Sequence, residues 1–149
     1  MAIYLEEPEQ FNPKLEVVGC FLEYGEKILL LHRQENKSQG NTWGVPGGKI
    51  EKGEDAIDAA VRETVEETGF MTSKTAIEYL SKVFIKYPAY DYIYHMIRYK
   101  IAGHPSEVRI NFNEHKGFTW VTPKDALNME LMLDEDPCIR LIYAKQIAN

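Results

Sequence analysis

Three glutamates, Glu63, Glu66 and Glu67, stand in a stretch that is rich in helix-forming residues. In a helix with 100° per residue, Glu66 lies at about 300° and Glu67 at about 40° from Glu63, so the three carboxylates share one face. Like charges at these spacings repel, and the last two also lie near the helix end where the dipole disfavours anions. A cation such as Mg²⁺, which prefers carboxylate oxygens, removes both penalties. The spacing alone leaves two alternatives open, a metal site and a solvated acidic face.

The helix that carries these carboxylates is predicted over residues 54–68, and it ends at Gly69, the residue type that most often stops a helix. Its predicted core-facing stripe consists of Ile57, Val61, Thr64 and Val65. Small residues are expected to leave room for a ligand beside the carboxylates, namely Ala56, Ala59 and Ala60. Ahead of the helix, Gly47 and Gly48 break any regular element, because adjacent glycines permit backbone angles that other residues avoid.

The same stretch carries a longer pattern: Gly48, five residues, Glu54, seven residues, and then Arg62-Glu63-Thr64-Val65-Glu66-Glu67-Thr68-Gly69-Phe70. It resembles the signature of the Nudix (MutT-like) hydrolases, G-x5-E-x7-R-E-U-x-E-E-x-G-U, in which U is a bulky aliphatic residue. All fixed positions match across residues 48–70. Two positions depart mildly, because Thr64 replaces the usual aliphatic residue and Phe70 is aromatic, and both departures concern packing. The segments Trp43–Gly48 and Phe118–Val121 also resemble the family.

The resemblance implies an α+β fold, an α/β/α sandwich in which a mixed β-sheet lies between helices. It implies a site for Mg²⁺ or Mn²⁺ whose ligands are Glu63, Glu66, Glu67 and the backbone carbonyl of Gly48. It also implies that Arg62 pairs with Glu54 and holds the loop and helix of the motif in register. The reaction is then hydrolysis of a pyrophosphate bond, in which metal ions neutralise phosphate oxygens and activate water while a carboxylate takes the proton.

Which glutamate acts as the base is left open, since Glu63 is either a ligand or the base. Glu114 is the candidate from outside the helix, because it lies in a polar loop just before the strand predicted at Phe118–Val121. A solvent-exposed loop acid is the equal alternative. The histidines show no ligand-like spacing and are expected at the surface or in the core. The predicted catalytic residues are therefore Arg62, Glu63, Glu66, Glu67 and Glu114.

The elements around the motif follow from hydrophobic patterning and turn residues. Strands are predicted at residues 16–24, 27–33, 76–87, 92–101 and 118–121, and the first two form a hairpin around Gly25. Thr122 and Pro123 start a helix. A last helix is predicted from about residue 137 to 146, capped by Asp134 or Asp136. Residues 1–14 are expected to form a loose lead-in. This order indicates a sheet with helices on its faces.

Composition narrows the class of protein. The 149 residues are expected to form one domain, 1–149, around one core. A net charge of −6 argues against a nucleic-acid polymer or an anionic membrane as partner. The N-terminus lacks the pattern of a signal peptide, and no apolar stretch is long enough to span a bilayer. Cys20 and Cys138 are expected to be buried free thiols, which fits a cytoplasmic location.

Substrate recognition is the least determined feature. Four tyrosines gather around one predicted turn, and they either stack on a base or simply favour strands: Tyr87, Tyr90, Tyr92 and Tyr94. Arg33 and Lys49 are each either phosphate ligands or solvated cations.

The leading hypothesis is a hydrolase of a small nucleotide-like substrate, in which a nucleoside diphosphate is linked to another group. Candidates are a nucleoside triphosphate, an oxidised nucleotide and a sugar nucleotide. The alternative is a non-catalytic nucleotide- or metabolite-sensing module, which should tolerate loss of motif glutamates. All of them are present, which favours the enzyme. An acidic helix that merely contacts a basic partner leaves the glycines and Arg62 unexplained. A homodimer through the tyrosine-rich strand or the N-terminal segment is left open.

Overall fold

The computed structural model describes residues 1–105 and 107–149. Its strands are β1 (Ala2–Tyr4), β2 (Pro13–Tyr24), β3 (Lys27–Arg33), β4 (Trp43–Gly44), β5 (Gly47–Lys49), β6 (Ile77–Lys86), β7 (Asp91–Lys100) and β8 (His115–Val121). Its α-helices are α1 (Ala56–Thr68), α2 (Pro123–Ala126), α3 (Glu135–Ile142) and α4 (Ala144–Ala148), and a 3-10 helix, η1, spans Lys74–Ala76.

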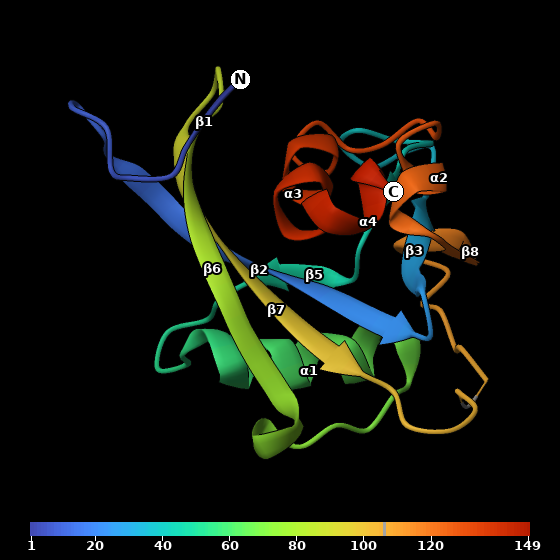
Figure 1. Cartoon of the computed structure of the whole chain (residues 1–149). Helices are drawn as coiled ribbons and strands as arrows, with labels where there is room; N and C mark the ends of the chain where they lie inside the picture. The colour runs from blue at the N-terminus through green and yellow to red at the C-terminus, as the bar shows by residue number, and fades with distance from the viewer. Residues whose placement is uncertain (106) are drawn as a thin grey trace.

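The strands form one mixed sheet in the order β1-β6-β7-β2-β3-β4, with β5 paired to β2 and β8 paired to β3 (Figure 1). Strands β2 and β7 run parallel, whereas the other strand pairs are antiparallel. The long strand β2 pairs with β5 at Val17–Gly19 and with β3 at Glu23 and Tyr24. The first residues of the motif, in β5, are thereby fixed against the sheet.

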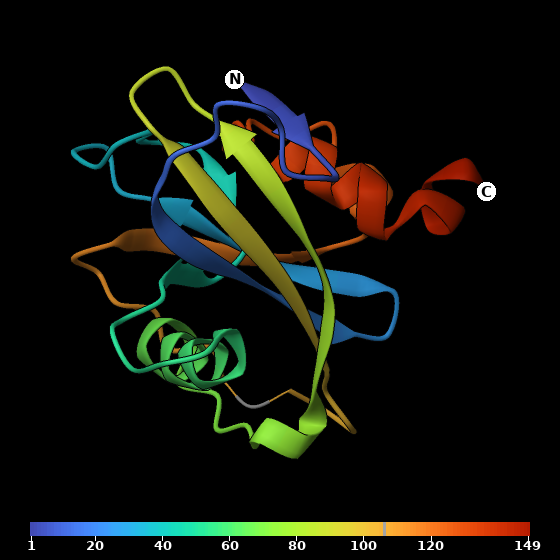
Figure 2. The same cartoon turned by 90° about the vertical axis from the view of Figure 1, so that its left-hand side faces the viewer.

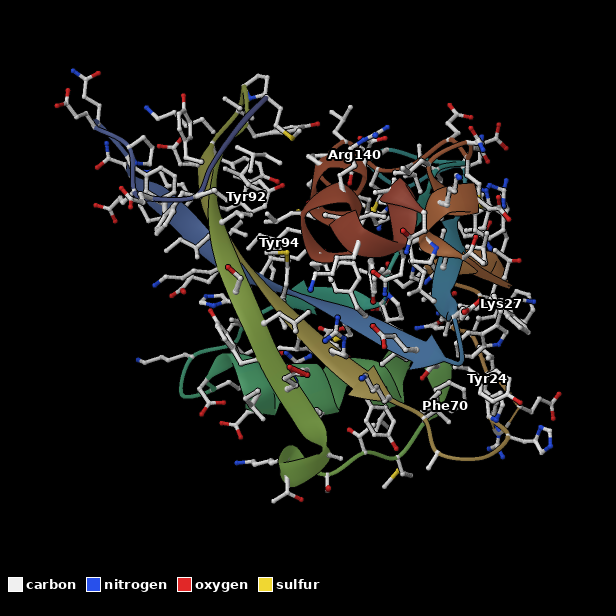
Figure 3. All side chains as sticks on the ribbon, in the orientation of Figure 1. Tyr24, Lys27, Phe70, Tyr92, Tyr94 and Arg140 are labelled. Carbon is white, nitrogen blue, oxygen red and sulfur yellow. The ribbon has the colours of Figure 1, made fainter. Side chains whose placement is uncertain are left out.

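Helices cover both faces of this sheet. Figure 1 shows α1 below the strands and α3 with α4 above them, and the turned view in Figure 2 shows the same separation. The sheet face toward α3 buries Tyr94 together with Cys138 and Ile139, and the opposite face buries Phe70 with Ala59. Figure 3 shows Tyr92 and Tyr94 on the α3 side and Phe70 near α1. The predicted α+β fold, an α/β/α sandwich with a mixed sheet, is confirmed.

Helix α1 begins two residues later than predicted, at Ala56, because Asp55 caps it. The Asp55 carboxylate accepts the N–H of Asp58 at 2.8 Å, and the Asp58 carboxylate accepts the N–H of Asp55 at 3.2 Å. This reciprocal capping places Glu54 outside the helix. Gly69 ends the helix as predicted, with a φ of 80°.

The predicted core-facing stripe of α1 is wrong in part. Ala59, Ala60 and Thr64 are fully buried, whereas Val65 is 37% exposed. The two alanines therefore pack toward the sheet and leave no room for a ligand there. Short side chains let the helix approach the strands closely, and this rotation turns two of the motif glutamates toward the sheet.

The two ends of the chain also differ from prediction. Residues 1–14 are not a loose lead-in, because β1 pairs with β6 and β2 already begins at Pro13. The last helix is two helices that meet at Tyr143, whose hydroxyl donates to Glu23 Oε2 at 2.6 Å. The Asp134 side chain makes no capping bond to α3. The break between the two helices therefore lies at the residue that this bond anchors to the sheet.

The prediction for the two cysteines is confirmed where the structure describes the chain. Cys20 and Cys138 are buried free cysteines. Among residues 1–105 and 107–149, no helix is long and apolar enough to cross a membrane.

Candidate active site

Arg62 links the loop and the helix of the motif. Its Nε and Nη2 atoms donate to the two carboxylate oxygens of Glu54, each at 2.8 Å, so the predicted pair is bidentate. Nη2 also donates to the carbonyl of Lys49 at 3.0 Å. Nη1 reaches Glu63 at 2.9 Å and Glu66 at 3.4 Å. The guanidinium lowers the pKa of Glu54 to about 2. One side chain therefore holds the loop backbone and orients two motif carboxylates.

The motif glutamates differ in their surroundings. The Glu63 and Glu67 residues are each 9% exposed, whereas the Glu66 side chain is 55% exposed. Glu67 Oε1 accepts the N–H of Gly47 at 2.6 Å. Burial raises the pKa of Glu67 to about 8, and burial also raises the pKa of Glu63. The carboxylates of Glu63 and Glu67 are thus shielded from bulk water, which makes their ionisation unfavourable.

A cavity of about 550 Å³, here called the catalytic cavity, brings the predicted site residues together. Its lining includes Gly48, Glu63, Glu66, Glu67 and Glu114, along with the cations Arg33 and Lys49. Helix α1 supplies three of the carboxylates, β5 supplies the glycine, and the loop before β8 supplies Glu114. The two cations whose roles were left open therefore lie at the same cavity as the carboxylates.

Gly48 is required at this cavity for a steric reason. A Cβ atom at this position would collide with the carboxylate of Glu63, so any other residue would displace that carboxylate from its place beside the loop backbone. The loop backbone and the Glu63 carboxylate are thereby adjacent. Among residues 1–105 and 107–149, no three Asp, Glu, His or Cys side chains stand close enough as arranged to hold a metal ion. The bonds from Arg62 and from the Gly47 N–H engage the carboxylates in this arrangement.

His115, which was expected at the surface or in the core, is buried next to a motif carboxylate. Its ring is buried, and Nδ1 lies 3.5 Å from Glu67 Oε2 with no hydrogen-bond partner in the described chain. Burial lowers the pKa of His115 to about 4, which keeps the imidazole neutral near pH 7. Its neighbour Glu114 contacts Lys37 at 3.5 Å and remains 44% exposed. The only signal in the sequence was the adjacency of His115 to Glu114.

A second, smaller cavity of about 150 Å³, here called the inner cavity, adjoins the first. The two cavities share Arg33, Gly47, Gly48 and Glu67 among their lining residues. Tyr94 lines the inner cavity, whereas the rings of Tyr87 and Tyr90 pack on each other at the β6–β7 turn. The tyrosines therefore do not act together as one platform. Two adjacent acids at the start of α3 also line the inner cavity: Asp134, which the sequence indicated only as a helix cap, and Glu135, to which it gave no role.

Comparison with known proteins places this arrangement in a family. The NUDIX domain family matches residues 13–142. The CTP pyrophosphohydrolase of Escherichia coli (strain K12) is 28% identical over 135 residues, which cover 91% of this chain and 96% of that protein. The solution structure of the E. coli ORF135 protein is similar, with a TM-score of 0.70 and 27% identity over 91% of this chain and 92% of the other.

The fold also matches the crystal structure of a MutT protein from Methanosarcina mazei Go1. The TM-score is 0.74 at 21% identity, and the match covers 92% of this chain and 97% of the other. The sequence motif, the fold and the family match agree. The chain belongs to the NUDIX family, as its motif predicted, and its class is that of the Nudix pyrophosphohydrolases.

Proposed function

We propose that this protein hydrolyses a pyrophosphate bond in a small nucleotide, with Mg²⁺ held at the catalytic cavity. The observation that carries the proposal is the gathering of Glu63, Glu66, Glu67 and Glu114 around one cavity that also holds Arg33 and Lys49. Hydrolysis of such a substrate needs carboxylates that bind a metal ion and cationic side chains that bind phosphate. The relative named for CTP, matched over 91% of this chain, favours a nucleoside triphosphate over a sugar nucleotide.

The residues at the cavity fit a hard divalent cation. All the carboxylates are oxygen donors of the kind that Mg²⁺ prefers, and Gly48 lets the loop backbone lie close to the Glu63 carboxylate. The proposed ligands are Glu63, Glu66, Glu67 and the carbonyl of Gly48. When bound by these residues, Mg²⁺ would supply the positive charge that offsets the charge on the phosphate oxygens and would make a nearby water more acidic.

The other residues of the site orient groups and move a proton. Arg62 keeps Glu63 and Glu66 directed at the cavity, and the Gly47 N–H fixes one oxygen of Glu67. Glu114 is not bound to Arg62 or to a backbone N–H of the motif loop, and we assign it the role of proton acceptor from water. Arg33 and Lys49 hold the phosphate chain.

A hydrolysis screen tests this proposal. The protein is incubated with Mg²⁺ and nucleoside triphosphates, oxidised nucleotides, nucleotide sugars or dinucleoside polyphosphates, and products are separated by anion exchange. We expect hydrolysis of at least one nucleotide class, complete loss with EDTA, and recovery when Mg²⁺ is restored. Matched variants sharpen the result: Glu114→Gln should lower kcat by about 10²- to 10³-fold without changing Mg²⁺ affinity. Glu26→Gln, in the β2–β3 turn, should behave as the wild type.

Two results would contradict the proposal. Hydrolysis that survives EDTA would remove the metal from the reaction. Folded protein that binds Mg²⁺ and a nucleotide but hydrolyses none of the classes would instead favour the sensing module on the same fold.

A further inference from the structure

His115, the first residue of β8, has a buried ring nitrogen without a hydrogen-bond partner. The residue is 4% exposed, and its Nδ1 atom makes no hydrogen bond to any part of the chain that the structure describes. Nδ1 lies 3.5 Å from Oε2 of Glu67, one of the proposed metal ligands. Most buried polar atoms are hydrogen-bonded, so a buried nitrogen left over beside a carboxylate calls for an explanation.

A β-bulge decides where this side chain points. Strand β8 pairs regularly with β3 as far as Gly117, but Arg33 then lies opposite His115 instead of Lys116. Residues that lie opposite each other point to the same face of a sheet, so the extra residue turns His115 to the face of Arg33. In an unshifted ladder, Lys116 would occupy that place and His115 would point to the opposite face. The bulge therefore brings an imidazole, and not a lysine, to the motif helix.

The backbone that carries the ring is held by several hydrogen bonds. The N–H of His115 donates to the carbonyl of Asn111 at 2.9 Å, and its carbonyl accepts the side-chain amide of Gln34 at 3.4 Å. The same amide donates to the carbonyl of Phe112 at 2.8 Å, and the N–H of Gln34 donates to the carbonyl of Glu114 at 3.0 Å. A donor that is fixed in advance loses little freedom when it makes its bond.

Each oxygen of the Glu67 carboxylate faces its own nitrogen. Oε1 accepts the N–H of Gly47, in β5, at 2.6 Å, and Oε2 faces Nδ1 of His115, in β8. A carboxylate oxygen has two lone pairs, so an oxygen that accepts an N–H can still bind a cation. Burial raises the pKa of Glu67 to about 8, whereas donors on both oxygens favour the ionised form that a metal ion requires.

His115 meets the catalytic cavity only through Glu67. Glu67 lines both cavities, whereas His115 lines the inner cavity and is not part of the lining of the catalytic cavity. The imidazole is therefore placed to orient a metal ligand and not to contact the metal ion or the substrate itself. Groups that bond to metal-binding carboxylates in this way fix the direction of the ligand atoms.

We propose that His115 is a positioning residue of the metal site, whose Nδ1–H donates to Oε2 of Glu67 and fixes the direction in which that carboxylate meets the cation. The proposal rests on the function proposed above and adds a residue to its site. The distance of 3.5 Å is longer than the usual N–H···O range of about 2.7–3.2 Å. Hydrogen bonds at catalytic sites tighten once the ligands are in place.

Titration with Mn²⁺, followed by electron paramagnetic resonance, tests the proposal without turnover. His115→Leu removes the donor, so Mn²⁺ affinity should fall by about tenfold or more. His115→Asn keeps an N–H donor near the position of Nδ1 and should stay within about threefold of the wild type. His104→Leu is the matched control, because Nδ1 of His104 contacts the hydroxyl of Tyr24 at 3.0 Å, outside both cavities. This control should bind Mn²⁺ as the wild type does.

A double variant shows whether the effect of His115 passes through Glu67. Glu67→Gln alone should lose Mn²⁺ affinity. Adding His115→Leu should lower the affinity by less than about threefold more, because the carboxylate that His115 positions is already gone. Thermal unfolding in EDTA checks that each variant is folded.

A measurement on the wild type tests the same bond even where His115→Leu does not fold. In ¹⁵N-labelled protein with Mg²⁺, the imidazole nitrogen resonances show which ring nitrogen carries the proton. We expect the proton of His115 on Nδ1, since only that nitrogen faces Glu67 as a donor. A bare Nδ1 in the Mg²⁺-loaded protein would overturn the proposal.

The binding results also separate this proposal from the proposed function. Wild-type affinity in His115→Leu, an equal loss in His115→Asn, or a full second loss in the double variant would each overturn the role of His115. If Glu67→Gln still loses affinity in that case, the proposed metal site stands without it. Mn²⁺ binding that depends on His115, in protein that hydrolyses no nucleotide, would keep the positioning role and reject the enzyme.

Discussion

The catalytic cavity and the inner cavity both depend on buried acids, but they are built in different ways. Glu63 and Glu67 come from one short stretch of sequence, and the cation of Arg62 contacts the first of them. Glu135 is held by an N–H of the segment after β4 and by a hydroxyl of β7, residues far from it in the chain. No cation contacts its carboxylate among the hydrogen bonds and ion pairs of the described residues.

A cationic partner and neutral hydrogen-bond donors suit a carboxylate to different kinds of chemistry. Carboxylates beside an arginine stay directed at the cavity and can exchange that partner for a metal ion. Carboxylates held by neutral donors keep a fixed orientation and suit the recognition of a fixed hydrogen-bonding edge. Under the proposed function, the carboxylates beside Arg62 take part in catalysis, whereas Glu135 is held by neutral donors outside the proposed metal ligands.

The largest expected effect comes from exchanging one acid in each cavity for its amide. Glu67→Gln should lower kcat for the preferred nucleotide by about 10²- to 10⁴-fold, because a metal ligand loses its charge. Glu135→Gln should leave kcat within about threefold of the wild type, because Glu135 does not line the catalytic cavity. Steady-state kinetics of both variants checks this contrast. Equal losses of kcat would erase the division between the cavities.

Thermal unfolding in EDTA is the control for folding of Glu67→Gln. The same measurement tests the effect of burying this acid. The pKa of Glu67 is about 8 in the folded protein and about 4.5 when unperturbed, so its ionisation destabilises the folded state as pH rises. The variant should be more stable than the wild type above pH 8, and the difference should vanish near pH 4.5. A difference that grows toward acid pH would contradict this.

The next largest effect concerns the glycine beside Glu63. Gly48→Ala places a methyl group against that carboxylate and should weaken Mg²⁺ binding by about 10- to 100-fold. Gly117→Ala is the matched control, because its new Cβ would meet nothing closer than 3.9 Å. Calorimetric titration with Mg²⁺ compares the two. Unchanged affinity in Gly48→Ala would show that the loop backbone takes no part in the metal site.

A smaller effect follows from Arg62→Lys. Lysine keeps the charge but cannot make the bidentate bond to Glu54, so the loop and helix lose their register. We expect kcat/KM to fall by about tenfold and the free energy of unfolding to fall with it. Glu54→Gln should reproduce both changes. Wild-type kinetics in both variants would reduce this pair to a surface contact.

The smallest effect lies in the inner cavity. Tyr94→Phe removes the hydroxyl that donates to Glu135 and should lower the free energy of unfolding by about 1 kcal/mol while Mg²⁺ affinity stays unchanged. Urea denaturation and metal titration measure the two quantities. A loss of metal affinity would indicate that the cavities are coupled rather than separate.

The sequence predicted what is encoded locally. The fold class, the hairpin around Gly25, the Gly69 cap and the Arg62–Glu54 contact follow from spacing, turn chemistry and the motif. The face of α1 that packs on the sheet could not be predicted from such local signals. A hydrophobic stripe predicted that Val65 would be buried, but close packing of Ala59 and Ala60 on the strands decided the rotation.

Features that depend on distant contacts were missed. His115 reaches Glu67 only because β8 pairs with β3 beside the motif. Glu135 reads as one more acid at a helix start, and its burial depends on Tyr94 and Val45 from other parts of the chain. The catalytic residues themselves remain predictions that the structure supports by bringing them to one cavity.

Mn²⁺ binding, followed by electron paramagnetic resonance, tests most directly whether the catalytic cavity is the metal site. It is measured in the wild type, Glu67→Gln and Glu135→Gln. We expect tight binding in the wild type, loss of at least tenfold in affinity in Glu67→Gln, and wild-type affinity in Glu135→Gln. Equal affinity in all three proteins would contradict the assignment of the catalytic cavity as the metal site.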